Sequence, residues 1–426
     1  MTEARSAAPS RRVHVVGAGM AGLACAVRLT AKGVPVSLWE GAGQAGGRCR
    51  SFHDATLDRH IDNGNHLLLS GNRAVGEFLA TIGAPADVLA GPERASFPFL
   101  DLSTGERWVV RPSAGLIPWW VFSPRTRIPG TAIGEYLAGI RLARAKPGDT
   151  IAELFDTGSP LYKRFWEPLT IAALNTDPEE AAAELLWPVI QETFGKGEAA
   201  CRPRYAPDGL SAAFVDPALA WLAGRGAKIT LKRRLSGVEF QGDRVGSLLF
   251  GSERVVVEEG EAVVLALPPA GVAGLLPDLD LPDQYRAIVN VHYRLDHAPK
   301  GFVSPLGILG GTAEWLFVRG DIASVTVSAA DALAEVDAGE VIARVWRDVA
   351  RALNLDPASP APLARVIKEK RATFAQTPGQ VAKRPEARTR WRNLALAGDW
   401  TNTGLPATIE GAMRSGESAA VAVDSR

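Results

Sequence analysis

Short runs of apolar residues alternate with helical stretches at the beginning, in the middle and at the end of the chain. Residues 13–16 and 35–40 form such runs on either side of a helical stretch at 23–31. A further run at 263–267 is followed, much later, by one at 393–397 that leads into a helix. Continuous apolar runs of this length are typical of parallel strands covered on both faces. The pattern predicts an α/β unit assembled from distant parts of the chain.

The segments between these runs have a different pattern. Apolar and polar positions alternate in three of them, which suits antiparallel strands with one covered face; these are residues 285–296, 314–319 and 323–328. The periodicity at 341–353 predicts an amphipathic helix. Residues 73–195 indicate mixed helices and loops, with apolar positions at helical spacing in Ile133, Leu137 and Ile140. These segments are predicted to form a separate cap or substrate region.

A chain of 426 residues also favours two domains, because single cores stop growing near roughly 250 to 300 residues. From residue 209 the pattern again predicts helix and strand, as in the first unit. The helix is expected at 210–224 and the strands at 227–231 and 235–240. The expected division is a polar, disordered tail at 1–10, an α/β domain at 11–72, 205–275 and 388–426, and an α+β cap at 73–204 and 276–387.

Composition excludes several classes of protein. Lys plus Arg and Asp plus Glu both number 47, which removes the global positive field needed for nonspecific nucleic-acid binding. Three cysteines without CxxC spacing support neither a disulfide framework nor a zinc site, so no metal is expected. The polar start lacks a secretory signal, and no apolar run approaches the roughly 20 residues of a membrane span. A cytoplasmic protein with at most peripheral membrane contact is expected.

The first strand is followed by a glycine-rich turn in which glycine stands at three significant positions. Glycine allows a tight turn, a close approach of backbone to a pyrophosphate, and helix–sheet packing, and the helix N-terminus then faces the anion. The turn consists of Gly17, Ala18, Gly19, Met20, Ala21 and Gly22. Glu40 ends the next strand, where a carboxylate can accept from ribose hydroxyls. This context predicts a dinucleotide site.

Residues 46–48 favour FAD over NAD as the dinucleotide. Gly46 and Gly47 provide a flexible backbone beside the fixed cation Arg48, which together suit a second approach to the pyrophosphate. An exposed loop arginine is the alternative interpretation of Arg48.

These three features together resemble the flavin-dependent amine oxidase and phytoene desaturase superfamily. The resemblance implies a Rossmann-like FAD-binding domain with a discontinuous α+β substrate domain, and noncovalent FAD, since no cysteine lies near the C-terminal motif. Residues 394–400 and 408–412 are similar to that superfamily's C-terminal flavin motif and to the helix that points at the flavin. The further flavin contacts that the resemblance implies are Gly64, Asn65, Val238, Gly398, Asp399, Thr408 and Ile409.

Within this superfamily the chain resembles the hydroxysqualene dehydroxylases of hopanoid biosynthesis over nearly its whole length. The most telling stretches are 62–69, 166–169 with 173–176, and 398–401 with 404–411. Asn65 stands where a glutamine is usual, which puts the chemistry of that position in doubt. The resemblance implies reductive removal of the hydroxyl of hydroxysqualene by reduced FAD, giving squalene. A carotenoid or isoprenoid desaturase, an amine oxidase, and a non-catalytic flavin-bearing scaffold for terpene enzymes are the alternatives.

An allylic hydroxyl leaves most readily when an acid protonates it in a dry site with apolar or aromatic walls. The candidate acids are His66, Asp62 and Glu167, with His66 the most attractive because it titrates near neutral pH. The candidate substrate contacts are Phe165, Trp166, Leu169, Trp187, Phe194 and Trp400. The alternative for the substrate contacts is that they are core residues. The alternative for His66 is a structural role.

Residues 114–122 are apolar, contain two tryptophans, and are followed by Arg125 and Arg127. This combination suits an interfacial membrane anchor for an enzyme with a lipid substrate. Packing of the same stretch against the cap is the alternative.

Overall fold

The computed structural model describes residues 11–115 and 117–424, and the tail expected at 1–10 lies outside them. The first domain is built on a five-stranded sheet in the order β19-β13-β1-β2-β9, with every neighbouring pair parallel. Its strands are β1 (Val13–Val16), β2 (Val36–Trp39), β9 (Lys228–Thr230), β13 (Ala262–Leu265) and β19 (Leu394–Leu396). The predicted parallel sheet, assembled from distant segments, is confirmed.

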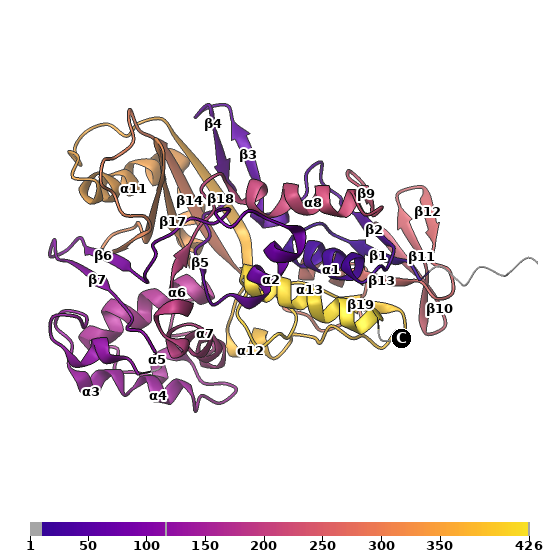
Figure 1. Ribbon diagram of the computed structural model, residues 1–426, viewed down its shortest axis with the longest axis horizontal. Helices are drawn as coiled ribbons and strands as arrows, with labels where there is room; N and C mark the ends of the chain where they lie inside the picture. The colour runs from indigo at the N-terminus through magenta and orange to yellow at the C-terminus, as the bar shows by residue number, and fades with distance from the viewer. Residues whose placement is uncertain (1–10, 116, 425–426) are drawn as a thin grey trace, which may run out of the picture.

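Helices cover one face of this sheet, as Figure 1 shows. They are α1 (Met20–Ala31), α2 (Arg73–Ile82), α8 (Asp216–Ala223) and α13 (Ile409–Asp424). α1 begins three residues before its predicted start, within the glycine turn itself. α2 packs into the same core through Ala74 and Phe78, although the predicted division assigned residue 73 to the cap.

The opposite face of the parallel sheet packs against a small antiparallel sheet and a short helix. These elements are β10 (Gly237–Gln241), β11 (Arg244–Phe250), β12 (Glu253–Val256) and α9 (Pro269–Ala273). Val16 and Leu265 face this second core, whereas Val15 and Val264 face the first. Both faces of the central strands are therefore covered, which explains why their sequences are mostly apolar.

The second domain contains a seven-stranded sheet in the order β18-β14-β17-β16-β15-β6-β7. Its strands are β6 (Phe97–Asp101), β7 (Arg107–Val110), β14 (Tyr285–Arg294), β15 (Leu306–Leu309), β16 (Trp315–Arg319), β17 (Ile322–Val327) and β18 (Ala364–Phe374). Helices α10 (Asp331–Glu335) and α11 (Ala338–Ala352) cover one face. The predicted antiparallel pairing of β14, β16 and β17 is confirmed.

β6 and β7 correct the prediction of only helices and loops at 73–195. Phe97, Phe99 and Trp108 are buried against neighbouring aromatic side chains, and Leu100 is buried on the other face of β6. β6 also pairs in parallel with β15, some two hundred residues later in the chain. Such a long-range pairing leaves little local signal.

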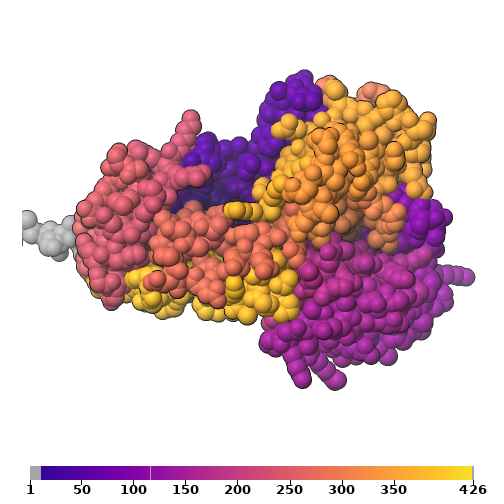
Figure 2. Space-filling view, turned by 180° about the vertical axis from the view of Figure 1, so that it is seen from behind, coloured from indigo at the N-terminus to yellow at the C-terminus, as the bar shows by residue number. Residues whose placement is uncertain are grey.

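Residues 117–200, which we call the helical lobe, form the magenta body at the lower right of Figure 2. Its helices are α3 (Ile133–Tyr136), α4 (Gly139–Leu142), α5 (Ile151–Leu154), α6 (Glu167–Leu174) and α7 (Leu186–Glu192). A π-helical turn at Tyr162–Trp166 precedes α6, and another at Ser211–Val215 precedes α8. Each is followed by an acidic residue and a proline, whose missing N–H cannot continue the regular helical hydrogen-bond series.

Short elements complete the chain between the two domains. They are β3 (Ser51–Asp54), β4 (Arg59–Asp62), β5 (Leu68–Leu69), β8 (Pro203–Arg204) and α12 (Pro378–Val381). Among the described residues, no helix has the length and apolar character needed to cross a membrane.

Candidate functional site

The glycine turn between β1 and α1 has the geometry that its sequence predicts. A Cβ at Gly17 would lie 2.2 Å from the carbonyl oxygen of Ala266, and one at Gly22 would lie 1.9 Å from that of Gly17. Both positions therefore exclude any side chain. A Cβ at Gly19 would meet no atom within 4 Å, so open space lies directly before the N-terminus of α1.

This open space suits an anion. The first turn of α1 carries no acidic residue, and its N-cap, Gly19, provides no side-chain hydrogen bond. No side chain of the turn itself therefore neutralises the positive end of the helix dipole. A pyrophosphate fits this donor set, and the residues Ala18, Met20 and Ala21 predicted beside it lie in the same turn.

Residues 46–48 lie against the glycine turn, as predicted. The Gly46 N–H donates to the Ala18 carbonyl at 2.8 Å, and a Cβ at Gly47 would lie 3.3 Å from the Cα of Gly19. Arg48 then extends to the far end of the chain, where its Nη2 lies 2.8 Å from Oδ1 of Asp399. Gly19, Arg48 and Asp399, which we call the clamp, are thus brought together from three distant segments.

Glu40 lies beside the same turn, where its carboxylate accepts from the N–H groups of Ala18 and Ala42, both at 2.8 Å. The carboxylate therefore orders the backbone on which the dinucleotide is expected. The N–H of Arg233 donates to the Glu40 carbonyl, which brings the segment leading into β10 close to this point. Val238, the predicted adenine contact, lies half-buried on β10.

The C-terminal motif is organised around Gly398 and Ser415. The Gly398 N–H donates to Oγ of Ser415 at 2.8 Å, and φ of Gly398 is 156°. Thr408 accepts from the Gly411 N–H in the first turn of α13, so its hydroxyl caps that helix. Ile409 follows and is buried. The segment from Asp399 to α13 is therefore rigidly placed beside the clamp.

Trp400, an expected substrate contact, lies elsewhere. Its ring is 1% exposed, packs in the core beneath β13 and β19, and donates to the Leu267 carbonyl at 2.9 Å. A Cβ at Gly398 would lie 2.2 Å from the indole nitrogen. We therefore interpret Trp400 as a core residue that requires glycine at 398.

Gly64 and Asn65 lie against the second domain's sheet. The Asn65 side chain donates to Thr326 at 3.1 Å, and Thr326 donates to Asn290 at 2.8 Å. A Cβ at Gly64 would lie 3.0 Å from Nδ2 of Asn290. Asn65 therefore joins the segment expected along the flavin to β14 and β17.

Several buried polar residues near this segment were not predicted from the sequence. Asn290 and His292 interrupt an otherwise apolar, alternating strand, a signal that could have marked β14 as polar on one face. Gln376 is fully buried and accepts from the Ala407 N–H just before α13. Arg384 donates to the Thr401 carbonyl beside the clamp. No local pattern distinguishes Gln376 or Arg384 from a surface residue.

The three candidate acids occupy different environments. Asp62 is fully engaged: Oδ1 accepts from Ser51 and from the Leu210 N–H, and Oδ2 pairs with Arg319 at 2.7 Å. Burial lowers the pKa of His66 to about 4, so its imidazole is neutral at pH 7. Burial, with Glu179 nearby, raises the pKa of Glu167. Of the three, Glu167 is the one whose environment favours the protonated acid.

The predicted wall residues gather in one aromatic cluster of the helical lobe. Trp166 stacks on Phe155 with ring centroids 4.6 Å apart, and Phe165 meets Phe194 edge-on at 5.5 Å. Phe165 and Trp166 are buried, whereas Leu169, Trp187 and Phe194 are half-buried. The structure therefore brings the predicted walls together.

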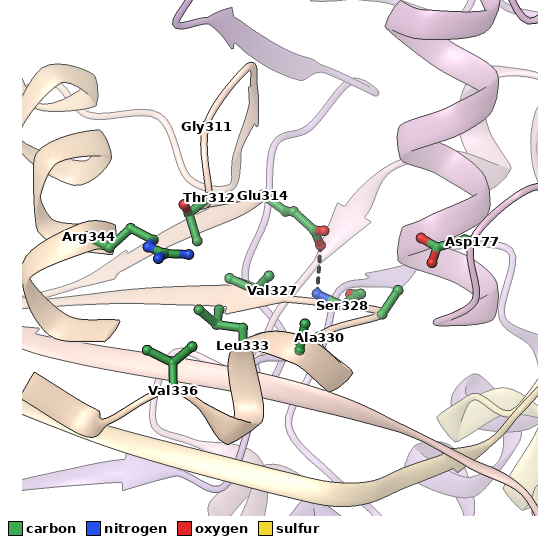
Figure 3. Close-up of a pocket in the computed structure, with 12 residues that line it drawn as sticks. Asp177, Gly311, Thr312, Glu314, Val327, Ser328, Ala330, Leu333, Val336 and Arg344 are labelled. Carbon is green, nitrogen blue, oxygen red and sulfur yellow. Dashed lines mark hydrogen bonds between the residues drawn. The ribbon is translucent and has the colours of Figure 1, made fainter. Parts of the chain in front are cut away.

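A pocket of about 350 Å³ lies in the second domain, between α10, α11 and the loop before β16 (Figure 3). Glu314 accepts there from the Ser328 N–H at 2.7 Å, and burial raises its pKa to about 8. Asp177 and Arg344 line the same pocket from opposite sides. The pocket contains none of the predicted flavin or acid residues and is separate from the clamp.

Comparison with known proteins connects this arrangement to a family. The family model described as flavin containing amine oxidoreductase matches residues 20–424. This protein belongs to the flavin containing amine oxidoreductase family. The protein is therefore a flavin-dependent oxidoreductase.

Among curated members of this family, the hydroxysqualene dehydroxylase of Rhodopseudomonas palustris is 47% identical over 412 residues, covering 96% of this chain and 98% of that protein. The hydroxysqualene dehydroxylase of Sinorhizobium fredii is 44% identical over 410 residues, covering 96% of this chain and 97% of that protein. The probable zeta-carotene desaturase of Synechococcus elongatus is 25% identical and covers 97% of this chain and 98% of its own. The chain therefore groups with the hydroxysqualene dehydroxylases.

Solved structures share the fold of this family member. Cyclohexylamine oxidase from Brevibacterium oxydans superimposes with a TM-score of 0.68 at 15% identity, covering 98% of this chain and 99% of that chain. A putative protoporphyrinogen oxidase from Exiguobacterium superimposes with a TM-score of 0.69 at 14% identity, covering 98% of this chain and 99% of that chain. The predicted amine oxidase type of fold is confirmed.

Proposed function

We propose that this protein removes the hydroxyl group of hydroxysqualene reductively to give squalene, in hopanoid or squalene biosynthesis. The observation that carries the proposal is identity of 42–47% to three hydroxysqualene dehydroxylases over 96% of the chain. Zeta-carotene desaturases match at 19–25% over 96–97% of the chain. The difference favours a dehydroxylase over a desaturase.

The cofactor we propose is FAD, held without a covalent bond. The open space at Gly19 and the guanidinium of Arg48 suit a pyrophosphate, and the strand end at Glu40 suits an adenosine ribose, which FAD has and FMN lacks. Cys25, Cys49 and Cys201 are all buried. Burial raises the pKa of the Cys49 thiol to about 12, which makes this thiol a poor nucleophile for attachment.

When bound, FAD in its reduced form supplies the hydride that replaces the hydroxyl group. The chain must supply a proton to the departing oxygen, so that the allylic C–O bond breaks and water leaves. Glu167 is the proposed donor because its raised pKa keeps the carboxyl protonated to higher pH. The aromatic cluster of the helical lobe excludes water and offers ring faces to the positive charge that develops.

The deciding experiment is one anaerobic turnover. Reduced holoprotein is mixed with hydroxysqualene, and we expect the yellow absorbance of oxidised flavin to return while mass spectrometry finds squalene. Reduction of oxidised flavin by a carotenoid precursor or by an amine would instead identify a desaturase or an amine oxidase. Unchanged absorbance with every candidate, together with binding of terpene-pathway enzymes, would identify a scaffold.

We also propose that the enzyme acts in the cytoplasm at the inner face of the cell membrane, close to other terpene-pathway enzymes. Its proposed substrate and product are long hydrocarbons that partition into lipid. The cysteines are unpaired and buried among the described residues, which suits a reducing compartment.

A further inference from the structure

Exposed apolar side chains are concentrated on one part of the helical lobe. Trp119 is 61% exposed and Leu137 is 65% exposed. Six of the large apolar residues that are exposed in the described chain lie between residues 117 and 140. They are Ile117, Trp119, Phe122, Ile133, Leu137 and Ile140, which we call the apolar surface.

The apolar surface is held in place by buried neighbours. One 3-10 turn carries the exposed Trp119 and Phe122 at its two ends. Trp120 and Val121 lie between them and pack into the core of the lobe. Trp120 also meets Tyr136 of α3 edge-on, with ring centroids 5.4 Å apart. The exposed side chains therefore belong to an ordered structure that keeps them in solvent, at a cost of hydration free energy.

This part of the chain is also strongly basic. Residues 111–146 contain six Lys and Arg residues and one acidic residue, Glu135, in a chain whose charges balance overall. Glu135 is used internally, accepting from the N–H groups of Ala132 and Leu161. Within the described residues, neither Arg125 nor Arg144 forms an ion pair. The charges of Arg125 and Arg144 are therefore available to an external anion.

The apolar surface lies one layer above the predicted substrate walls. Gly139 stands between Leu137 and Ile140, and a Cβ there would lie 3.2 Å from the ring of Trp166. The ring of Trp166 thus forms the next layer inward, in the cluster that contains Phe155 and Phe165.

We infer that the apolar surface and its arginines dock the enzyme on an anionic phospholipid bilayer. Tryptophan and phenylalanine insert at the boundary between headgroups and acyl chains, while arginines beside them pair with anionic headgroups. α3 and α4 are single short turns, so they lie on the bilayer without crossing it. The inference rests on the proposed lipid substrate, which this surface would receive directly from the membrane beside Trp166.

Vesicle flotation tests the docking. Wild-type holoprotein is expected to float with vesicles of phosphatidylcholine containing phosphatidylglycerol and to bind pure phosphatidylcholine at least tenfold more weakly. Combined Trp119→Ser, Phe122→Ser and Leu137→Ser substitutions are expected to lower the partition coefficient more than tenfold. Arg125→Gln and Arg144→Gln are each expected to lower it about fivefold on anionic vesicles alone.

A matched control uses exposed apolar residues of the second domain. Combined Val303→Ser, Leu355→Ser and Leu363→Ser substitutions remove the same number of exposed apolar side chains elsewhere and are expected to leave the partition unchanged. Equal losses of the partition coefficient in both triple variants would overturn the inference. Equal binding of the wild type to anionic and to pure phosphatidylcholine vesicles would also overturn it.

A site-specific probe gives an independent readout. The native cysteines are buried, so an environment-sensitive thiol dye should label Leu137→Cys selectively. Its emission is expected to shift to the blue when anionic vesicles are added, whereas the same dye on Leu363→Cys should not respond. No shift at residue 137, or a shift that depends on protein concentration without lipid, would show that the surface is not a membrane site; the second result would indicate a contact between copies of the chain.

The inference and the proposed function can fail separately. Each variant is assayed for flavin reoxidation by hydroxysqualene dissolved in detergent micelles, where docking is not needed. Failure of wild type in this assay with intact vesicle binding would reject the substrate and leave the surface standing. Turnover in micelles without vesicle binding would reject the docking alone.

Discussion

The guanidinium of Arg48 and the carboxylate of Asp399 are separated by 351 positions in the chain and lie 2.8 Å apart. Asp399 is buried and is paired with Arg48, and Arg48 also donates to the Ala372 carbonyl. One side chain therefore joins the glycine turn, β18 and the C-terminal motif. The sequence around Arg48 predicts that it lies beside the pyrophosphate. It does not predict the contacts of Arg48 with Asp399 and Ala372.

Replacement of Arg48 by alanine should weaken flavin binding strongly. The change removes the cation nearest the expected pyrophosphate and leaves Asp399 buried without its partner. We expect the dissociation constant for FAD to rise at least tenfold in a fluorescence titration of apoprotein. Arg344→Ala, which removes an exposed i,i+4 ion pair on α11, should leave it unchanged. Equal constants for Arg48→Ala and wild type would contradict the clamp.

Glu167→Gln should slow catalysis without loss of flavin. An amide keeps the size of the side chain but cannot give up a proton, and general acids contribute on the order of a hundredfold. Because burial raises the pKa of Glu167, the wild-type rate of flavin reoxidation by hydroxysqualene should fall as pH rises through that raised pKa. Glu179→Gln removes a neighbouring negative charge, so it should lower the pKa of Glu167 and move the fall in rate to lower pH. A pH profile of the same shape in Glu167→Gln would assign the proton to another group.

His292 should make the folded state sensitive to acid. Burial lowers its pKa from 6.5 to about 4, so between these values the unfolded chain binds more protons than the folded one. Stability is therefore complete above pH 6.5 and is lost as pH falls through this window, by about 2 kcal/mol at pH 5. Urea unfolding at pH 7.5 and pH 5 measures the loss, which His292→Gln should reduce. An unchanged loss in the variant would show that other groups cause it.

At the scale of elements, α1 and α13 show how small residues decide the packing of helices. Gly416 of α13 lies against Ala21 and Cys25 of α1, so that the backbones approach closely. Glu410, on the same helix, accepts from the N–H groups of Ala74 and Val75 and so caps α2. α13 thereby holds two other helices while its N-terminus lies next to the clamp.

Gly416→Ala should destabilise the protein because the new Cβ would lie 2.2 Å from the Ala21 carbonyl oxygen, which must move. We expect a loss of about 1 to 3 kcal/mol in the free energy of unfolding. Gly76→Ala in α2 is the matched control, since a Cβ there meets nothing within 4 Å. That variant should gain about 0.5 to 1 kcal/mol from helix propensity. A higher urea unfolding midpoint for Gly416→Ala than for Gly76→Ala would contradict the close packing of α13 on α1.

Elements with strong local periodicity or a continuous apolar run were predicted well, even where they pair over long distances, whereas β6 and β7 were not. The strand β14 and the helix α11 have strong local periodicity. β6 pairs with both β7 and β15 and was assigned to helices and loops. The periodicity at Ile133, Leu137 and Ile140 predicted helices correctly but did not reveal that these residues face solvent.

At the scale of the whole molecule, the expected cofactor site draws on segments from both domains. The glycine turn and the clamp belong to the parallel-sheet domain, and Asn65 joins the same region to β14 and β17. In Figure 2 the indigo N-terminal segment lies between segments coloured pink and orange. Binding of a ligand in this position should therefore stabilise both domains together.

FAD should raise the midpoint of thermal unfolding of apoprotein more than FMN does. A ligand at one hundred times its dissociation constant stabilises the folded state by about 2.7 kcal/mol. FMN lacks the adenosine that the region of Glu40 is expected to hold, so its effect at equal concentration should be smaller. Differential scanning fluorimetry with both nucleotides measures this. Equal shifts would mean that the adenosine end is not bound.

Features that depend on a residue's own backbone and on short spacing follow from the order of amino acids alone. Gly17 and Gly22 are needed because no side chain fits in their turn, and a strand covered on both faces, such as β13, is apolar at every position. These requirements are local, so the apolar runs and the glycine spacing are enough to infer the parallel sheet and the dinucleotide turn. The flavin family was inferred from the resemblance of residues 46–48, 394–400 and 408–412 to its motifs.

The partners that each residue meets, and the depth of its burial, were set by the tertiary fold. Asp62 is engaged by Ser51 and Arg319, and Trp400 is sealed in a core, although both were expected near substrate. The exposure of Leu137 follows the same rule, because an amphipathic pattern is identical whether its apolar face meets a core or solvent. Burial and partners depend on elements hundreds of positions away, and no local pattern encodes them.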